Sequence, residues 1–327
     1  MVEGSTLISD AVWVLTDGRP GHISQTLGLA EALARAPIVK TIHLRAPFRE
    51  ASPFLGWAGG RALTDDSSQV APPWPRLVIT SGRSALAVAL AIRRATRGRT
   101  FLVNVQDPGF YRSRFDLVVV PEHDRLSGPN IMSTAGALGR VTPARLEDAA
   151  AAFGPSLEHL QRPRVAVLMG GANAVFSAPR AVAERIARDL AGLAANGYGL
   201  MITFSRRTGA EMEGIIRAAL ADRGAAIWDG QGANPYFAYL ALADHILATE
   251  DSASMISEAA TTGKPVSVMP LEGGSPKFTR FHEAMRARGA TRPFAGEIED
   301  WRYEPVDETR RVAAAIQSML YRGKGTL

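Results

Sequence analysis

Carboxylates and hydroxyls follow an apolar run in the stretch HILATEDSASMISEAATTGKP, residues 245–265. In chain order they are Glu250, Asp251, Ser252 and Ser254. An Asp or Ser at this place is a typical helix cap, and Gly-Lys-Pro at the other end of the stretch is a typical helix stop. Capping accounts for Asp251, but it leaves the next carboxylate, that of Glu258, unexplained.

Glu258 predicts a ligand that extends along this helix. Its Cα would lie about 9 Å along the helix from Ser252, at a rise of roughly 1.5 Å per residue. Helical side chains lean back toward the helix start. A nucleoside diphosphate fits this layout, with its phosphates at the helix start beside Ser252 and its ribose hydroxyls donating to Glu258.

A second polar cluster follows the first apolar run of the chain, in the turn TDGRPGH. Asp17 and His22 are its candidate general bases, because either could take a proton from a bound hydroxyl. Glycines in such a turn let the backbone approach an anion. The alternative is a tight turn that merely ends in a polar residue. Its other candidate residues are Gly18, Arg19 and Gly21.

Several further turns place polar residues after apolar runs, where ligands of open α/β sheets bind. In the first half they supply Ser81, Gly82, Arg83, Gln106, Asp107, His123 and Asp124. In the second half they supply Gly170, Gly171, Asn173, Ser205, Arg206 and Lys277. Arg206 and the adjacent Arg207 could hold a phosphate or could simply be solvated. No turn matches the dinucleotide or P-loop fingerprints.

Composition bounds the class of protein. The chain has 327 residues, of which 46% are hydrophobic and 21% charged, as in an ordinary soluble globular protein of two domains. It has no Cys, which excludes disulfides and thiolate chemistry and is compatible with a reducing cytoplasm. The histidines show no metal-ligand spacing, so we expect no metal and no cofactor.

The net charge of +5 makes anionic ligands or an anionic membrane surface plausible partners. The arginines are spread along the chain and no nucleic-acid motif occurs, so nucleic acid is not expected as a partner. No apolar run is long enough for a spanning helix, and the first residues lack a signal-peptide pattern. We expect a cytoplasmic protein, with peripheral contact to the inner face of the membrane as an option.

Short apolar runs alternate with amphipathic stretches along the chain, which predicts an α/β fold of two Rossmann-like domains facing a cleft. The pattern is interrupted at 141–163, where we place a linker between domains 1–155 and 156–327. The residues 307–322 form a last helix that could pack back on the first domain. The Gly- and Pro-rich segment 52–75 could be a lid, a partner surface or a solvated loop. Strands are expected at 12–16, 38–44, 77–80, 101–105, 117–120, 165–169, 200–204, 225–228, 245–249 and 265–269.

These motifs resemble two related groups of proteins. The second half looks like the donor domain of GT-B glycosyltransferases, especially the enzymes that add N-acetylglucosamine to the peptidoglycan lipid precursor. DGRPGHISQTLGLAEAL, FSRRT and EDSASMISEA resemble more closely the bacterial homologues of the plant mitochondrial-fission protein named for elongated mitochondria. Glu250 and Glu258 also match a Glu-x7-Glu spacing known in retaining GT-B enzymes.

The resemblance implies a nucleotide-sugar site, and it leaves the reaction open. The leading hypothesis is a metal-independent GT-B glycosyltransferase that uses a nucleotide-diphosphate sugar, a UDP-sugar first of all, and transfers it to a lipid-linked or envelope glycan. One alternative is a nucleotide-sugar 2-epimerase of the same architecture. The other is a non-catalytic recruitment protein, since the plant protein is linked to recruiting a dynamin-like GTPase. The sugar, the acceptor and the stereochemistry are not encoded in any motif.

Overall fold

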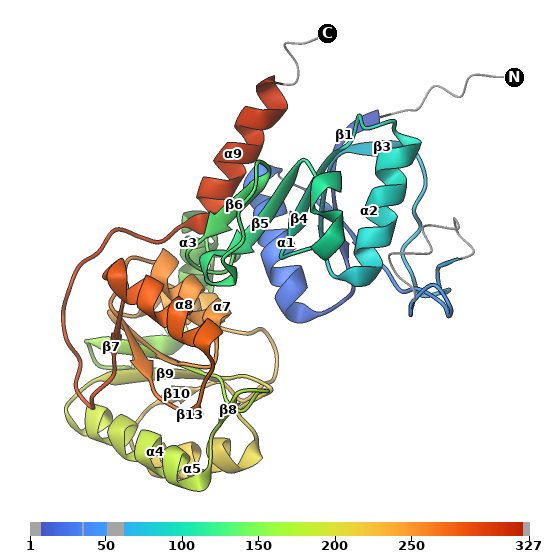
Figure 1. Cartoon of the computed structure of the whole chain (residues 1–327). Coiled ribbons are helices and arrows are strands. Elements are labelled where there is room, and N and C mark those ends of the chain that lie inside the picture. Colours follow the sequence, from blue (N-terminus) through green and yellow to red (C-terminus); the bar gives the residue numbers. More distant parts are fainter. Residues whose placement is uncertain (1–7, 35, 51–61, 323–327) are drawn as a thin grey trace, which may run out of the picture. The chain divides into compact units, whose positions relative to one another are not determined.

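The computed structural model describes residues 8–34, 36–50 and 62–322 (Figure 1). The described chain divides into two compact units. The first comprises the residues up to Arg140 and again those from Glu308, and the second is Val141–Asp307. The predicted boundary at 155/156 therefore falls inside the second unit.

The first unit contains a parallel sheet of six described strands. Its spatial order is β2-β1-β3-β4-β5-β6. The central strands β3, β4 and β5 are largely apolar and buried, as in a parallel sheet covered on both faces, whereas half of the edge strand β2 is exposed. The order of the strands reverses between β1 and β3, which makes this edge the expected ligand site of the sheet. The strands are β1 (Ile8–Thr16), β2 (Ile38–Thr41), β3 (Trp74–Ser81), β4 (Phe101–Val105), β5 (Leu117–Pro121) and β6 (Ile131–Thr134).

Helices cover both faces of this sheet. On one face, α2 (Arg83–Ala95) buries Leu86, Val88 and Ile92 against the strands. On the other face lie α1 (Pro20–Leu33) and the C-terminal α9 (Glu308–Arg322), whose Val312 and Ile316 belong to one apolar cluster with β1 and β3. Short 3-10 turns follow two strands, namely η2 (Gly109–Arg114) and η3 (Glu122–Asp124).

The second unit repeats the plan with a parallel sheet of order β10-β9-β7-β11-β12-β14. In chain order this is 3-2-1-4-5-6, the Rossmann arrangement, with its switch point between β7 and β11. The strands are β7 (Arg164–Met169), β9 (Gly199–Phe204), β10 (Ala226–Ile227), β11 (His245–Thr249), β12 (Val266–Met269) and β14 (Thr291–Pro293). A small antiparallel ribbon joins β8 (Phe176–Ser177) to β13 (Glu272–Gly273).

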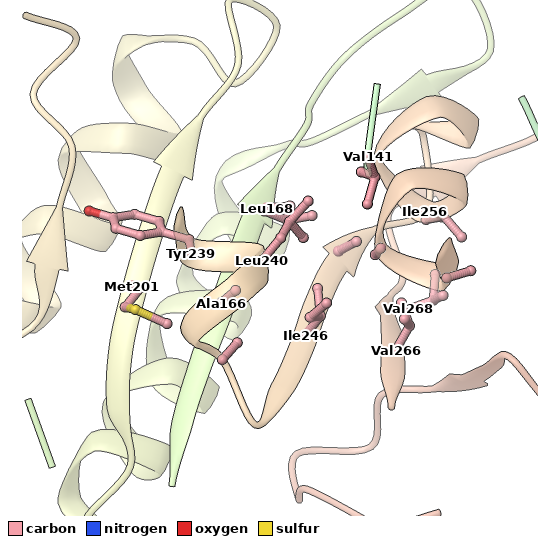
Figure 2. Close-up of a cluster of buried hydrophobic side chains, with 14 of the residues drawn as sticks. Val141, Ala166, Leu168, Met201, Tyr239, Leu240, Ile246, Ile256, Val266 and Val268 are labelled. Carbon is pink, nitrogen blue, oxygen red and sulfur yellow. The ribbon is translucent and has the colours of Figure 1, made fainter. Parts of the chain in front are cut away.

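Two apolar clusters sandwich the second sheet. On one face lie α4 (Arg180–Ala195) and α5 (Ala210–Leu220). The other cluster is shown in Figure 2, with side chains from β7, β9, β11 and β12 meeting those of the helices α6 and α7. The helices of this face are α3 (Pro143–Phe153), α6 (Tyr236–Leu242), α7 (Ala253–Thr261) and α8 (Pro276–Ala287).

The predicted linker at 141–163 is instead part of the second unit. It forms α3 and the 3-10 turn η4 (Gly154–Leu157), and Leu146 and Phe153 pack against the apolar cluster of Figure 2. The sequence of α3, which is rich in Ala and charged residues, hid this contact, because Leu146 and Phe153 are its only large apolar side chains.

The predicted α/β class with two Rossmann-like domains is confirmed. Every predicted apolar run contains a strand, and β6, β8, β13 and β14 are additional. Much of the segment 52–75 lies outside the described residues. Its described part includes Leu63, which pairs with Leu44, and the start of β3. None of the described helices is long and apolar enough to cross a bilayer.

Candidate functional site

An open pocket of about 770 Å³ lies in the first unit, where β1, β3 and β4 end. This is the switch point of the first sheet, where ligands of such sheets bind. Seven of the predicted residues line the pocket, namely Asp17, Arg19, His22, Gly82, Arg83, Gln106 and Asp107. Turns that follow different strands therefore form one wall of the pocket, because the carboxyl ends of parallel strands meet at the same edge of the sheet.

Asp17 and His22 form a hydrogen-bonded pair in this pocket. Nδ1 of His22 lies 3.0 Å from Oδ1 of Asp17, and both side chains are largely buried. A carboxylate only accepts hydrogen bonds, so the imidazole hydrogen of this contact is on Nδ1. Nε2 is then the nitrogen that can accept a proton, which is the arrangement of a general base held by a carboxylate.

Gly82 makes room for this pair. A Cβ on Gly82 would lie 2.6 Å from Oδ2 of Asp17, and its φ of +92° disfavours any other residue. Gly82 therefore lets the carboxylate lie against the turn after β3. Gly82 is a predicted candidate that lines the pocket, and it also gives Asp17 its place at the pocket wall.

Asp107 and Gln106 have different roles in the turn after β4. Both oxygens of Asp107 accept from Arg112, at 2.7 and 2.6 Å, and these bonds hold the pKa of Asp107 below its usual range. Asp107 thus fixes the turn. Gln106 has an uncommon φ of +77°, and Asn104 Nδ2 donates to its carbonyl at 2.7 Å.

The remaining first-half candidates do not line the pocket. They are Gly18, Gly21, Ser81, His123 and Asp124. His123 is 9% exposed, and its Nε2 lies 3.9 Å from Asp124. Residues that sequence reasoning missed also line the pocket, among them His43, Arg49 and Asn104. His43 follows β2. Because residues that follow parallel strands meet at one edge of the sheet, the sequence could have identified it.

In the second unit, Asp251 is the centre of a buried polar network at the switch point. Its side chain is fully buried. Oδ2 accepts from Arg207 at 2.7 Å, and Oδ1 accepts from Thr249 at 2.6 Å. Arg206, the predicted partner of a phosphate, is exposed, and the adjacent Arg207 forms the ion pair with Asp251. The choice between the two depends on the turn that follows β9.

The glycine pair after β7 accommodates this network. A Cβ on Gly170 would lie 2.1 Å from Oδ1 of Asp251, and one on Gly171 would lie 2.1 Å from the carbonyl oxygen of Arg207. Both glycines are donor-site candidates, and the structure shows that each leaves room for a close contact within the protein.

Ser252 caps α7, as predicted, since its Oγ accepts from the amide of Met255. Further along the helix, Glu258 is 9% exposed and Oε2 accepts from the hydroxyl of Tyr236 at 2.8 Å. Burial, together with this carboxylate, raises the pKa of Tyr236 well above its ordinary value. Tyr236 was not predicted, because it lies in α6, away from any motif.

The other second-half candidates differ in environment. Oε1 of Glu250 accepts from the amide of Leu271 at 2.6 Å, and burial raises the pKa of Glu250. Oδ1 of Asn173 accepts from two amides of its own turn. Oγ of Ser205 accepts from the amide of Arg207. Ser254 is half-buried and Lys277 is exposed at the start of α8.

Among the described residues, no three His, Asp or Glu side chains gather in a way that could hold a metal ion. The candidate residues that lie close together form two groups. One is the pocket with Asp17 and His22, and the other surrounds the start of α7 in the second unit.

The chain is similar in sequence to a known protein family and to two known proteins. The family model described as Mitochondrial fission ELM1 matches residues 20–320. The mitochondrial fission protein ELM1 of Arabidopsis thaliana is 31% identical over 273 residues, which are 75% of this chain and 64% of the plant protein. The chain thus spans less than two thirds of that relative. An uncharacterized protein of Rickettsia prowazekii is 28% identical over 355 residues, covering 94% of this chain and 98% of its own.

Among solved structures, the UDP-GlcNAc 2-epimerase of Methanocaldococcus jannaschii has a TM-score of 0.50 at 12% identity, covering 94% of this chain and 99% of the epimerase. At this identity the likeness shows the fold, which is of the GT-B kind. The predicted resemblance to the fission proteins is confirmed by the family match. Because that match extends over most of the sequence, the chain belongs to the mitochondrial fission ELM1 family.

Proposed function

We propose that this protein is a GT-B glycosyltransferase whose sugar donor is a nucleotide-diphosphate sugar, with UDP-sugars as the first candidates. One observation carries the proposal: the Asp17–His22 pair lines a large pocket at the switch point of the first sheet. Such a pair suits the removal of a proton from an acceptor hydroxyl.

On the acceptor side, Nε2 of His22 takes the hydroxyl proton as the acceptor oxygen attacks. Asp17 keeps the imidazole hydrogen on Nδ1 and stabilises the imidazolium that forms. Arg83 and Gln106 also line this pocket and orient the acceptor. We propose a lipid-linked or envelope glycan as acceptor, and peripheral contact of this cytoplasmic protein with the membrane. The assignment of His22 as the base applies to a transfer that inverts the configuration at the anomeric carbon, in which the attacking oxygen displaces the diphosphate directly.

On the donor side, the bond between the anomeric carbon and the diphosphate oxygen breaks, and its electron pair leaves with the diphosphate. The start of α7 with Ser252, and the exposed Arg206 and Lys277, stabilise this charge. Glu258, buried and bonded to Tyr236, is assigned to the ribose hydroxyls. This charge compensation comes from the protein, so the proposed reaction uses no metal or other cofactor.

Titration calorimetry with UDP, UDP-sugars, GDP and NAD tests the donor site. We expect saturable binding of UDP and of at least one UDP-sugar, and its loss in Glu258→Ala. Absence of all nucleotide binding would contradict the proposal and favour the alternative of a non-catalytic recruitment protein.

Release of UDP from the bound UDP-sugar, measured with a lipid-linked glycan extract as acceptor, tests the chemistry. We expect His22→Ala to bind UDP as the wild type does and to lose transfer by roughly 10²- to 10⁴-fold, the usual contribution of a general base. The matched control is His159→Ala, because His159 is exposed and lies outside the pocket. Conversion of the sugar without any acceptor would identify an epimerase instead.

A further inference from the structure

One wall of the pocket in the first unit is a single continuous turn. The residues 104–111, which end β4 and begin η2, all line the pocket. The only charged side chain among them is Asp107, and Arg112 forms an ion pair with it. This wall therefore presents neutral side chains to a ligand, in contrast to the Asp17–His22 pair that also lines the pocket.

Side-chain hydrogen bonds hold the turn in place. The amide of Gly109 donates to Oδ1 of Asp107 at 2.9 Å, and Arg112 donates to both carboxylate oxygens. Nδ2 of Asn130 donates to the carbonyl oxygens of Arg112 and Phe115, at 2.8 and 2.9 Å. These bonds fix the wall before a ligand arrives, which reduces the entropy that binding has to remove.

Gln106 has a strained backbone within this turn. Its φ of +77° lies in the left-handed region, which among the described non-glycine residues only Arg97 and Arg125 share. Two bonds impose this conformation, since its amide donates to the carbonyl of Val119 at 2.8 Å and its carbonyl accepts from Asn104 at 2.7 Å. The carboxamide of its side chain makes no hydrogen bond to any described residue. Such strain is typical of residues that contact ligands.

Asn104 adds a hydrogen-bond acceptor to the same wall. It is 4% exposed, and its Nδ2 donates to the carbonyl oxygens of Gln106 and Val105, at 2.7 and 3.4 Å. Carbonyl oxygens only accept, so these bonds determine which end of the amide is Oδ1. No described residue donates to Oδ1, and this oxygen, unlike the hydroxyls of Thr80 and Ser81, is not sealed from solvent. A donor on a ligand in the pocket can therefore reach it.

Phe110 adds an apolar face. Its side chain is 94% exposed and lines the pocket, although the bonds of Asp107 and Asn130 hold the turn that carries it. Covering such a ring with a ligand is favourable because apolar surface leaves water. The flat ring favours a flat partner.

The donors and acceptors of this wall restrict what it can bind. A carboxylate or phosphate has no hydrogen for Oδ1 of Asn104. A hydroxyl has one, but it is not planar. A secondary amide supplies an N–H for Oδ1 of Asn104, a carbonyl oxygen for Nε2 of Gln106, and a planar group for the ring of Phe110.

We propose that this wall binds a secondary amide of the acceptor, with Asn104, Gln106 and Phe110 as the residues that determine acceptor specificity. The inference rests on the proposed function, because there the pocket holds the acceptor. Two kinds of molecule carry such an amide, an N-acyl sugar and a peptide, and the experiment below separates them.

Three substitutions test the wall. Gln106→Met removes the carboxamide and keeps the length and neutrality of the side chain. Phe110→Ala removes the ring, and Phe110→Tyr retains it. The matched controls are Gln317→Met and Tyr321→Ala, because both side chains are exposed on α9 and lie outside the pocket. Asn104 is left unchanged because its own bonds hold the turn.

The ligands are N-acetylglucosamine, glucose, and N-acetylalanine methylamide, which has secondary amides but no sugar. NMR titrations follow the imidazole resonances of His22, which lines the same pocket. We expect N-acetylglucosamine to bind roughly 10-fold more tightly than glucose, because glucose lacks both amide hydrogen bonds. Binding of the peptide compound as well would identify a wall that accepts any secondary amide, and its absence would identify an N-acyl sugar.

The variants should change this preference. Gln106→Met should weaken N-acetylglucosamine binding by roughly 2- to 10-fold, as for one neutral hydrogen bond, and leave glucose unchanged. Phe110→Ala should weaken it by a similar factor, whereas Phe110→Tyr and both controls should bind as the wild type does.

Three outcomes would overturn the inference. The first is that neither amide compound binds more tightly than glucose, or that none shifts the resonances of His22. The second is that Gln106→Met and Phe110→Ala bind N-acetylglucosamine as the wild type does. The third is that the controls weaken binding equally. These titrations need neither UDP nor sugar transfer. A protein that prefers the amides but fails to bind UDP would contradict the proposed function alone.

Discussion

At the scale of single residues, the buried carboxylate of Asp251 governs the second site. It is completely shielded from solvent and accepts from Arg207 and Thr249, whereas Arg207 itself remains partly exposed. A charge in this position requires its partner, because removal of one member of a buried pair leaves the other uncompensated. The pair therefore holds the guanidinium of Arg207 at the turn after β9.

Arg207→Ala should lower the free energy of unfolding by about 2–3 kcal/mol, since it strands the carboxylate of Asp251. Arg206→Ala is the matched control, because the neighbouring side chain is exposed, and it should stay within about 0.5 kcal/mol of the wild type. Urea unfolding of the three proteins checks this. Equal effects of the two substitutions would contradict the assignment of the ion pair to Arg207.

Sequence reasoning found two arginines in the turn 205–207 and named Arg206 as the partner of a phosphate, which stays a prediction. Adjacent arginines carry the same local signal, and only the path of the turn decides which one faces Asp251 across the sheet. The same holds for Tyr236, which donates to Glu258 on another helix, 22 residues further along the chain.

At the scale of elements, the turn after β7 and the start of α7 are packed too closely for any side chain on Gly170. Gly170→Ala would bring a Cβ to 2.1 Å from Oδ1 of Asp251. We expect a loss of about 1–3 kcal/mol of stability from the forced displacement. Gly192→Ala is the control, because this glycine lies inside α4 with open space around it, and it should gain about 0.5–1 kcal/mol. Thermal or urea unfolding measures both. A neutral Gly170→Ala would show that the carboxylate moves without cost.

The end of α6 is held by Lys264, and this contact predicts a pH dependence. Nζ donates to the carbonyl oxygens of Leu240 and Ala241, and burial lowers the pKa of Lys264 from 10.5 to about 8. The folded state therefore releases this proton at lower pH than the unfolded state. Between pH 8 and 10.5 the unfolded chain binds more protons, so stability rises with pH in that window.

Relative to Lys264→Met, the wild type should gain about 1 kcal/mol between pH 7.5 and pH 9, as the linkage of a single group requires. The tyrosines with raised pKa values titrate in both proteins, so their effect cancels in the difference. Urea unfolding at several pH values measures this difference. A difference that is independent of pH would mean that Lys264 stays charged throughout the window.

At the scale of the whole molecule, the chain builds two sheets and then returns to the first. The residues of α9 follow the whole second unit in sequence, yet Val312 and Ile316 belong to the apolar cluster of β1, β3 and α1. Glu308 and Thr309 add hydrogen bonds to the backbone of Ala135 and Gly139. The first unit therefore depends on residues from both ends of the described chain.

Ile316→Ala should destabilise the first unit by about 2–4 kcal/mol, because its side chain is fully buried. Met319→Ala, on the same helix, should have a much smaller effect because Met319 is 39% exposed. Hydrogen exchange should show faster exchange in β1 and β3 for the first variant and unchanged rates in β7 and β11. Faster exchange in β7 and β11 instead would contradict the assignment of α9 to the first unit.

The sequence by itself determined the α/β class, the buried strands and a helix cap at Asp251 or Ser252, and it singled out Asp17 and His22 as candidate general bases. These features are local, since apolar runs, glycines and capping residues act within a few positions of one another. The tertiary structure alone decided that Gly82 makes room for Asp17 and that Gly170 makes room for Asp251, and it places the last helix, for which the sequence offered a return to the first domain, on the first sheet. Each of these contacts joins segments far apart in the chain, and no pattern within one segment records which distant atom will fill the space beside it.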